Sequence, residues 1–115
     1  MNKVFGLIQA RMGSKRLPGK ALLPINGQPI IKHIIDRMIC IEKLEGIILA
    51  TTEAKENDRL SNYVSNLNVK VWREKEENDI ASRLYNAAKY FKADAILKVN
   101  ADCPLIDPVI MKRLL

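Results

Sequence analysis

The chain has 115 residues, of which 48% are hydrophobic and 28% are charged. This length and composition are typical of one globular domain and exclude fibrous, disordered and disulfide-dense proteins. The net charge is +6, and most of the excess lies in the first twenty residues, which contain bases but no acid. Such a local excess favours a small polyanion as ligand over a long nucleic acid, which usually needs a spread basic face with stacking aromatics.

The sequence contains no targeting or membrane signal that we can identify. The N-terminal apolar run, Val4 to Ile8, is too short for the core of a signal peptide, and no run reaches the length of a membrane span. The two cysteines, Cys40 and Cys103, lack the spacing of a zinc site or a disulfide framework. We therefore expect a cytoplasmic protein with free thiols and with neither a membrane nor a nucleic-acid partner.

Apolar runs alternate with amphipathic stretches along the chain, which predicts strands that alternate with helices. Residues 3–9 form the first predicted strand, and residues 10–28, with three glycines and two prolines, a long irregular connection. The later predicted elements are a helix over 29–41, a strand over 47–51, a helix over 56–66, a strand over 69–72, a helix over 79–91, a strand over 95–99 and a helix that starts at 107.

This alternation predicts one α/β domain over residues 1–115 with a parallel, Rossmann-like sheet and right-handed crossovers. We expect the strand order 3-2-1-4, with the first strand central. A sheet of this kind binds ligands outside the carboxyl ends of its strands, where the strand order reverses. The loops expected there are residues 10–20 and 100–104.

The segment QARMGSKRLPGK begins at Gln9, at the end of the first predicted strand. Its glycines and Ser14 let backbone N–H groups approach a phosphate, and its bases supply charge. These bases are Arg11, Lys15, Arg16 and Lys20. It is not a Walker A loop, because Gly13 and Gly19 are one residue too far apart and Ala21 follows the lysine. We expect the segment to bind a triphosphate rather than to be a solvated basic loop.

Asp102 lies directly after the fourth predicted strand, followed by Cys103 and Pro104. A carboxylate beside a phosphate-binding loop suggests Mg²⁺, which takes one or two carboxylates together with phosphate oxygens and waters. This prediction rests on placement alone. The alternative is an aspartate that only stabilises its own turn.

The segment Ala10 to Lys20 resembles the signature loop of the cytidylyltransferases that activate acidic sugars, the acylneuraminate and 3-deoxy-manno-octulosonate group. The segment DCPLIDP, from Asp102 to Pro108, is similar to a second signature, that of the branch of spore coat polysaccharide biosynthesis protein F. The chain departs from that branch at Asn100-Ala101, where Thr-Gly is more usual. The resemblance covers the whole chain and implies a fold of the nucleotide-diphospho-sugar transferase type.

The resemblance implies an enzyme that transfers CMP from CTP to a sugar acceptor for surface polysaccharide synthesis and releases pyrophosphate. The residues alone leave another nucleoside triphosphate open as the ligand. Arg11 and Lys20 would stabilise the transition state, and Asp102 would hold Mg²⁺. The residues implied to bind the nucleotide are Ala10, Arg11, Gly13, Ser14, Lys15, Arg16, Lys20, Thr51, Thr52 and Arg73. Family members are longer, so we expect this chain to correspond to their N-terminal part, with a sheet that is incomplete at the C-terminus. Whether the protein forms a homodimer stays open.

Three alternatives remain. One is a catalytically incomplete module that binds a nucleotide or forms oligomers. Another is a glycosyltransferase that uses a nucleotide-sugar donor, although such enzymes commonly hold their metal with an Asp-x-Asp pair and position 100 is Asn. The third, a nucleic-acid binder, rests on charge alone.

Overall fold

A computed structural model describes residues 3–10, 20–75 and 80–100 of the chain. Its main sheet contains four strands, β1 (Val4–Gln9), β4 (Gly46–Thr52), β5 (Lys70–Glu74) and β6 (Ala95–Asn100). Its α-helices are α1 (Ile30–Ile39), α2 (Asp58–Ser65) and α3 (Ile80–Tyr90). The short elements are two 3₁₀ turns, η1 (Lys20–Leu22) and η2 (Lys55–Asn57), and a hairpin of β2 (Pro24–Ile25) and β3 (Gln28–Pro29).

The sheet has the strand order β5-β4-β1-β6, which confirms the predicted order 3-2-1-4. Strand β1 pairs in parallel with β4 on one side and with β6 on the other. The chain therefore reverses its direction of winding at β1. In a parallel sheet of this topology, the crevice outside the carboxyl ends of β1 and β6 is the expected ligand site.

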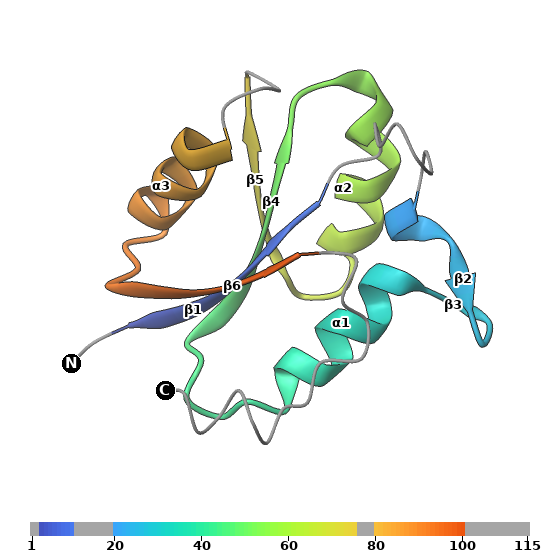
Figure 1. The fold of residues 1–115 in the computed structure, drawn as a ribbon, viewed down its shortest axis with the longest axis horizontal. Helices are drawn as coiled ribbons and strands as arrows, with labels where there is room; N and C mark the ends of the chain where they lie inside the picture. Colours follow the sequence, from blue (N-terminus) through green and yellow to red (C-terminus); the bar gives the residue numbers. More distant parts are fainter. Residues whose placement is uncertain (1–2, 11–19, 76–79, 101–115) are drawn as a thin grey trace.

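Helices cover both faces of the sheet (Figure 1). Successive strand residues point to opposite faces, so one face carries Ile8, Leu49 and Val99, which pack with α1 and α2. The other face carries Leu7 and Ile48, which pack with α3. Both faces are buried, which explains why β1 and β4 are apolar along most of their length rather than alternating. None of the described helices is both long and apolar enough to cross a bilayer.

The predicted connection over residues 10–28 has more structure than we expected. Its described part contains η1 and the β2–β3 hairpin, whose turn has Asn26 at φ 52° and Gly27 at φ 83°. Asn-Gly adopts left-handed backbone conformations readily, so this pair closes the hairpin. His33 of α1 is bonded through Nε2 to the carbonyl oxygen of Ile25 at 2.6 Å and ties the hairpin to the helix.

Helix boundaries differ from the predicted ones by one or two residues. Pro29 precedes α1 with an extended ψ of 149°, so the helix begins at Ile30. The first turn of the second predicted helix is a 3₁₀ turn, and α2 begins at Asp58. The last predicted helix, from residue 107, lies outside the described residues.

Candidate functional site

The four main strands end at one edge of the sheet, which we call the carboxyl edge. Gln9 at the end of β1 is level with Ala50 of β4 and Asn100 of β6, and Thr51 of β4 is level with Arg73 of β5. The segments that follow these strands therefore start side by side. This is the edge at which parallel α/β sheets bind ligands.

The predicted phosphate-binding segment is anchored at both ends by buried alanines. The N–H of Ala10 donates to the carbonyl oxygen of Ala50 at 3.2 Å and so continues the pairing of β1 with β4. Ala10 and Ala21 are 5% and 2% exposed and belong to one hydrophobic cluster. The chain thus leaves the sheet at the carboxyl edge and returns to the same core at η1.

Most of the predicted ligand-binding residues lie outside the described residues. These are Arg11, Gly13, Ser14, Lys15, Arg16 and the predicted metal ligand Asp102, and Lys20 is described by its backbone alone. Within the described residues, no three His, Cys, Asp or Glu side chains are grouped so that they could hold a metal ion. The predictions for these residues therefore stay predictions.

Thr51 and Thr52 end β4, and both are completely buried. The hydroxyl oxygen of Thr52 accepts hydrogen bonds from the N–H of Ala54 at 3.3 Å and from Nδ2 of Asn57 at 2.5 Å. The Thr51 hydroxyl, in contrast, has no hydrogen-bond partner among the described residues, and the same is true of the buried Oε1 of Gln9. Buried polar atoms without partners are uncommon, and they are often satisfied by a ligand or by water.

Arg73, the remaining predicted contact, lies near the end of β5 and reaches the turn that follows β4. Its Nε donates to the carbonyl oxygen of Thr52 at 2.8 Å. Its Nη2 donates to the carbonyl oxygen of Ala54 at 3.0 Å and to Oδ1 of Asp58 at 2.8 Å. The guanidinium group thus lies at the carboxyl edge, with two of its three nitrogens bound to the β4–α2 connection.

Two buried polar residues at this edge were missed by the sequence analysis. Asn57 is fully buried although it precedes a helix with a largely polar sequence, and Arg83, in the first turn of α3, is only 1% exposed. Arg83 lies one helical turn before the buried Ala87, whereas the apolar residues Leu84 and Ala88 are half-buried. The four-residue spacing between Arg83 and Ala87 places both on the same face of the helix, and this was the sequence signal that could have predicted the burial of Arg83.

The charge of Arg83 acts on Glu74, the last residue of β5. The Glu74 carboxylate accepts hydrogen bonds from Asn86 Nδ2 at 2.9 Å and from Trp72 Nε1 at 3.1 Å. These two bonds, and to a smaller degree the backbone N–H of Lys75 and then the positive charge of Arg83, hold the pKa of Glu74 below its ordinary value, although desolvation opposes the shift. Glu74 is therefore a fixed negative charge near the carboxyl edge.

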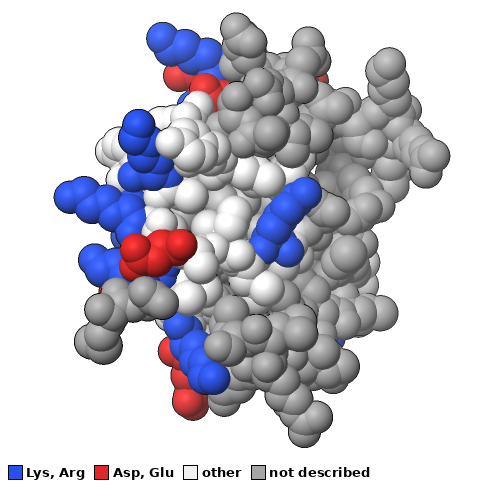
Figure 2. Space-filling model, turned by 60° about the vertical axis from the view of Figure 1, so that its left-hand side comes forward, with Lys and Arg blue, Asp and Glu red and all other residues white. Residues whose placement is uncertain are grey.

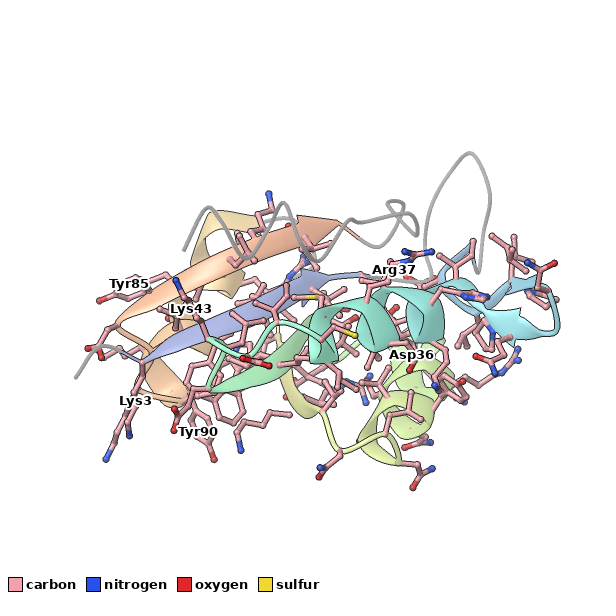
Figure 3. The ribbon with its side chains drawn as sticks, turned by 90° about the horizontal axis from the view of Figure 1, so that it is seen from below. Lys3, Asp36, Arg37, Lys43, Tyr85 and Tyr90 are labelled. Atoms are coloured by element: carbon pink, nitrogen blue, oxygen red, sulfur yellow. The ribbon has the colours of Figure 1, made fainter. Side chains whose placement is uncertain are left out.

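Other exposed features lie away from this edge. Figure 3 shows Lys3, Lys43, Tyr85 and Tyr90 at the end of the molecule opposite the β2–β3 hairpin. On the face in Figure 2, the basic side chains lie mostly along one margin with acidic ones among them, and an uncharged area lies beside them. The described part of that face therefore carries no continuous basic stripe.

Known proteins resemble the chain in both sequence and fold. The chain is 33% identical over 117 residues to the 8-amino-3,8-dideoxy-manno-octulosonate cytidylyltransferase of Shewanella frigidimarina, a match that covers 98% of this chain and 46% of that one. A cytidylyltransferase structure from Leptospira borgpetersenii superposes with a TM-score of 0.91 at 37% identity, and covers 98% of this chain and 47% of that one.

A third relative was solved with its nucleotide. The structure of CMP:2-keto-3-deoxy-manno-octonic acid synthetase complexed with CTP superposes with a TM-score of 0.84 at 28% identity, and the match covers 98% of this chain and 46% of that one. The chain thus spans about half the length of the relatives that it matches. The family model for cytidylyltransferases matches residues 5–115. The strand order, the carboxyl edge and this match agree, and the chain belongs to the cytidylyltransferase family.

Proposed function

We propose that the chain is the nucleotide-binding part of a sugar cytidylyltransferase, which moves CMP from CTP to a sugar hydroxyl and releases pyrophosphate. The observation that carries this proposal is the family match over residues 5–115. It agrees with the fold, because the predicted phosphate-binding segment starts at the carboxyl edge of the sheet. The CTP complex of a relative at 28% identity supports CTP as the nucleotide. The relative from Shewanella supports an eight-carbon acidic sugar as the acceptor class.

In this proposal the triphosphate is bound by the segment after β1. Arg11, Ser14, Lys15 and Lys20 would hold the phosphates, with help from Arg16 and from the backbone at Ala10 and Gly13. The end of β4, at Thr51 and Thr52, would lie against the base or the ribose. The Thr51 hydroxyl has no partner among the described residues, which supports this placement, because a nucleotide could supply one.

The reaction is a substitution at the α-phosphorus of CTP by the sugar hydroxyl, with pyrophosphate as the leaving group. The protein contributes mainly by placing the reactants and by neutralising charge that develops on the phosphate oxygens. Arg11 and Lys20 are the cations proposed for this role. A magnesium ion held by Asp102 would add Lewis-acid stabilisation, since a carboxylate oxygen is a donor that Mg²⁺ prefers.

A second candidate is a module that binds the nucleotide without turnover. It is favoured by one observation, namely that the chain spans about half the length of its relatives. The sugar pocket, the dimer contacts and turnover would then depend on sequence beyond the matched half. An assay of pyrophosphate release with CTP and 8-amino-3,8-dideoxy-manno-octulosonate separates the two candidates.

Thermal unfolding with each nucleoside triphosphate, with and without Mg²⁺, tests nucleotide binding directly. A ligand at about 100 times its Kd stabilises the folded state by about 2.7 kcal/mol. We expect CTP with Mg²⁺ to raise the melting temperature most, and Arg11→Ala and Asp102→Ala to reduce the rise. The control is Lys43→Ala, an exposed base at the opposite end of the molecule (Figure 3). If no triphosphate shifts the melting temperature, the proposed function is wrong.

A further inference from the structure

Two side chains from different elements converge on the short segment from Thr52, the last residue of β4, to Ala54. Arg73 of β5 binds the carbonyl oxygens of Thr52 and Ala54. Asn57, at the start of α2, binds the hydroxyl oxygen of Thr52. The N–H of Glu53 also donates to the carbonyl oxygen of Glu74 at 2.9 Å. The segment is therefore held from both sides.

The side chain of Asn57 bonds to Thr52 and does not cap helix α2. It occupies the N-cap position of α2, where an asparagine side chain normally accepts a hydrogen bond from an N–H of the first helical turn. Here the side chain makes no capping bond, and its Nδ2 donates to Thr52 Oγ1 at 2.5 Å. A residue that departs from a local structural rule and makes a tertiary contact instead is typical of a functional region.

Arg73 departs from the usual behaviour of an arginine on a strand at the edge of the described sheet. Its guanidinium group does not extend into solvent but folds onto the backbone of the β4–α2 connection. Asp58 accepts from the same Nη2 at 2.8 Å, and this ion pair fixes the plane of the guanidinium group. Arg73 donates to the two carbonyl oxygens from two nitrogens of one rigid, planar group, a geometry that the single nitrogen of a lysine does not provide.

We propose that Arg73, Asn57 and Asp58 are positioning residues, which hold the segment from Thr52 to Ala54 and thereby the end of β4 in the geometry that binds the nucleotide. This inference rests on the proposed function. It assigns Arg73 to the protein backbone rather than to the ligand and adds two residues to the site. A binding segment that is already ordered loses less conformational entropy on binding, and tighter binding follows.

The test measures the Kd of Mg·CTP by calorimetry for six single variants of the full 115-residue chain. We expect Arg73→Ala and Asn57→Ala each to weaken binding about tenfold, and Asp58→Ala to weaken it less, about threefold. The matched control is Arg59→Ala, because Arg59 is exposed, adjacent to Asp58 and on the same helix. It should bind as the wild type does. Thr52→Ser, which keeps the hydroxyl oxygen, should retain affinity that Thr52→Val loses.

A second measurement reports on the segment without any nucleotide. Amide hydrogen exchange of Glu53 and Ala54, whose N–H groups donate to Glu74 and Thr52, should accelerate in Arg73→Ala and Asn57→Ala but not in Arg59→Ala. Arg73→Ala and Asn57→Ala act on the same segment, so their effects on the Kd should not be additive. The double variant should bind Mg·CTP more tightly than the product of the two single effects predicts.

The outcomes separate this inference from the proposed function. If Arg73→Ala loses affinity while Asn57→Ala, Asp58→Ala and the two amide exchange rates stay at wild-type values, then Arg73 contacts the nucleotide and the inference is overturned, whereas the proposed function stands. If the wild type binds no triphosphate, the proposed function fails and this inference fails with it. Accelerated exchange together with weaker binding in both variants supports the inference.

Discussion

Thr51 and Thr52 are neighbours at the end of β4 and both are completely buried, yet only the Thr52 hydroxyl has hydrogen-bond partners among the described residues. The difference follows from the pleat of the strand, which turns the two side chains to opposite faces of the sheet. The two threonines are therefore expected to respond differently to the same substitution.

Thr51→Val should make the free protein more stable and the nucleotide complex weaker. Valine has almost the same shape and removes a buried hydroxyl that has no partner in the described part of the chain, so we expect a gain of about 1 kcal/mol in the free energy of unfolding. Urea unfolding measures the gain, and a CTP titration measures the loss of affinity. Thr51→Ser, which keeps the hydroxyl, should bind CTP as the wild type does. Equal affinity in all three proteins would remove Thr51 from the proposed site.

Glu74→Gln should cost stability at neutral pH but not in acid. The pKa of Glu74 is held below its ordinary value, mainly by the hydrogen bonds from Asn86 and Trp72. A carboxyl group whose pKa is lower in the folded than in the unfolded state stabilises the fold above the unfolded pKa, and this contribution is lost as the pH falls through the folded pKa.

The measurement is the urea midpoint of wild type and Glu74→Gln at about pH 7 and again below the ordinary carboxyl pKa, about 4.3. The gap between the two midpoints should shrink in acid. The exposed Glu45 provides a control, since Glu45→Gln makes the same change of charge away from these partners. A gap of constant size would show that the carboxylate charge is not what stabilises this cluster.

Gly6→Ala should destabilise the protein by overpacking. A Cβ added to Gly6 would collide with Cε of Met38 and would lie 3.0 Å from Cδ1 of Leu44. The colliding atom is the end of a flexible side chain that lines a cavity of about 250 Å³, so it can shift, and we expect a loss of about 1 kcal/mol, at the low end for overpacking. The double variant Gly6→Ala/Met38→Leu should recover part of this loss, because leucine is shorter. Additive effects of the two changes would disprove the proposed collision.

Arg83→Ala should cost more stability than a typical arginine substitution. Arg83 is among the largest fully buried side chains, so its removal leaves a cavity and takes away a charge that favours ionised Glu74. We expect a loss of about 3 kcal/mol, whereas exposed Arg59→Ala should change stability by no more than about 0.5 kcal/mol. Urea unfolding of both variants is the check, and similar losses would show that burial of Arg83 contributes little.

The arrangement of the main sheet was predictable because parallel strands that are buried on both faces have a recognisable apolar sequence. The two central strands β1 and β4 are short, mostly apolar runs, and helices of suitable length separate the four strands, which leaves few topologies. The β2–β3 hairpin was not predicted as strands, since two-residue strands have no periodicity, although its Asn26-Gly27 turn was visible. Arg83 was missed because a charged residue on a helix is normally solvated.

The sequence by itself determined the α/β class, the strand order and the position of Ala10 and Thr51 at one edge, because chain order and apolar spacing restrict parallel sheets so strongly. Only the tertiary structure distinguished the two threonines and showed that Arg73 and Asn57 hold the segment after β4. Those contacts join residues that are up to 21 positions apart in the chain. The partner of a polar side chain depends on the packing of neighbouring elements, which local sequence does not encode.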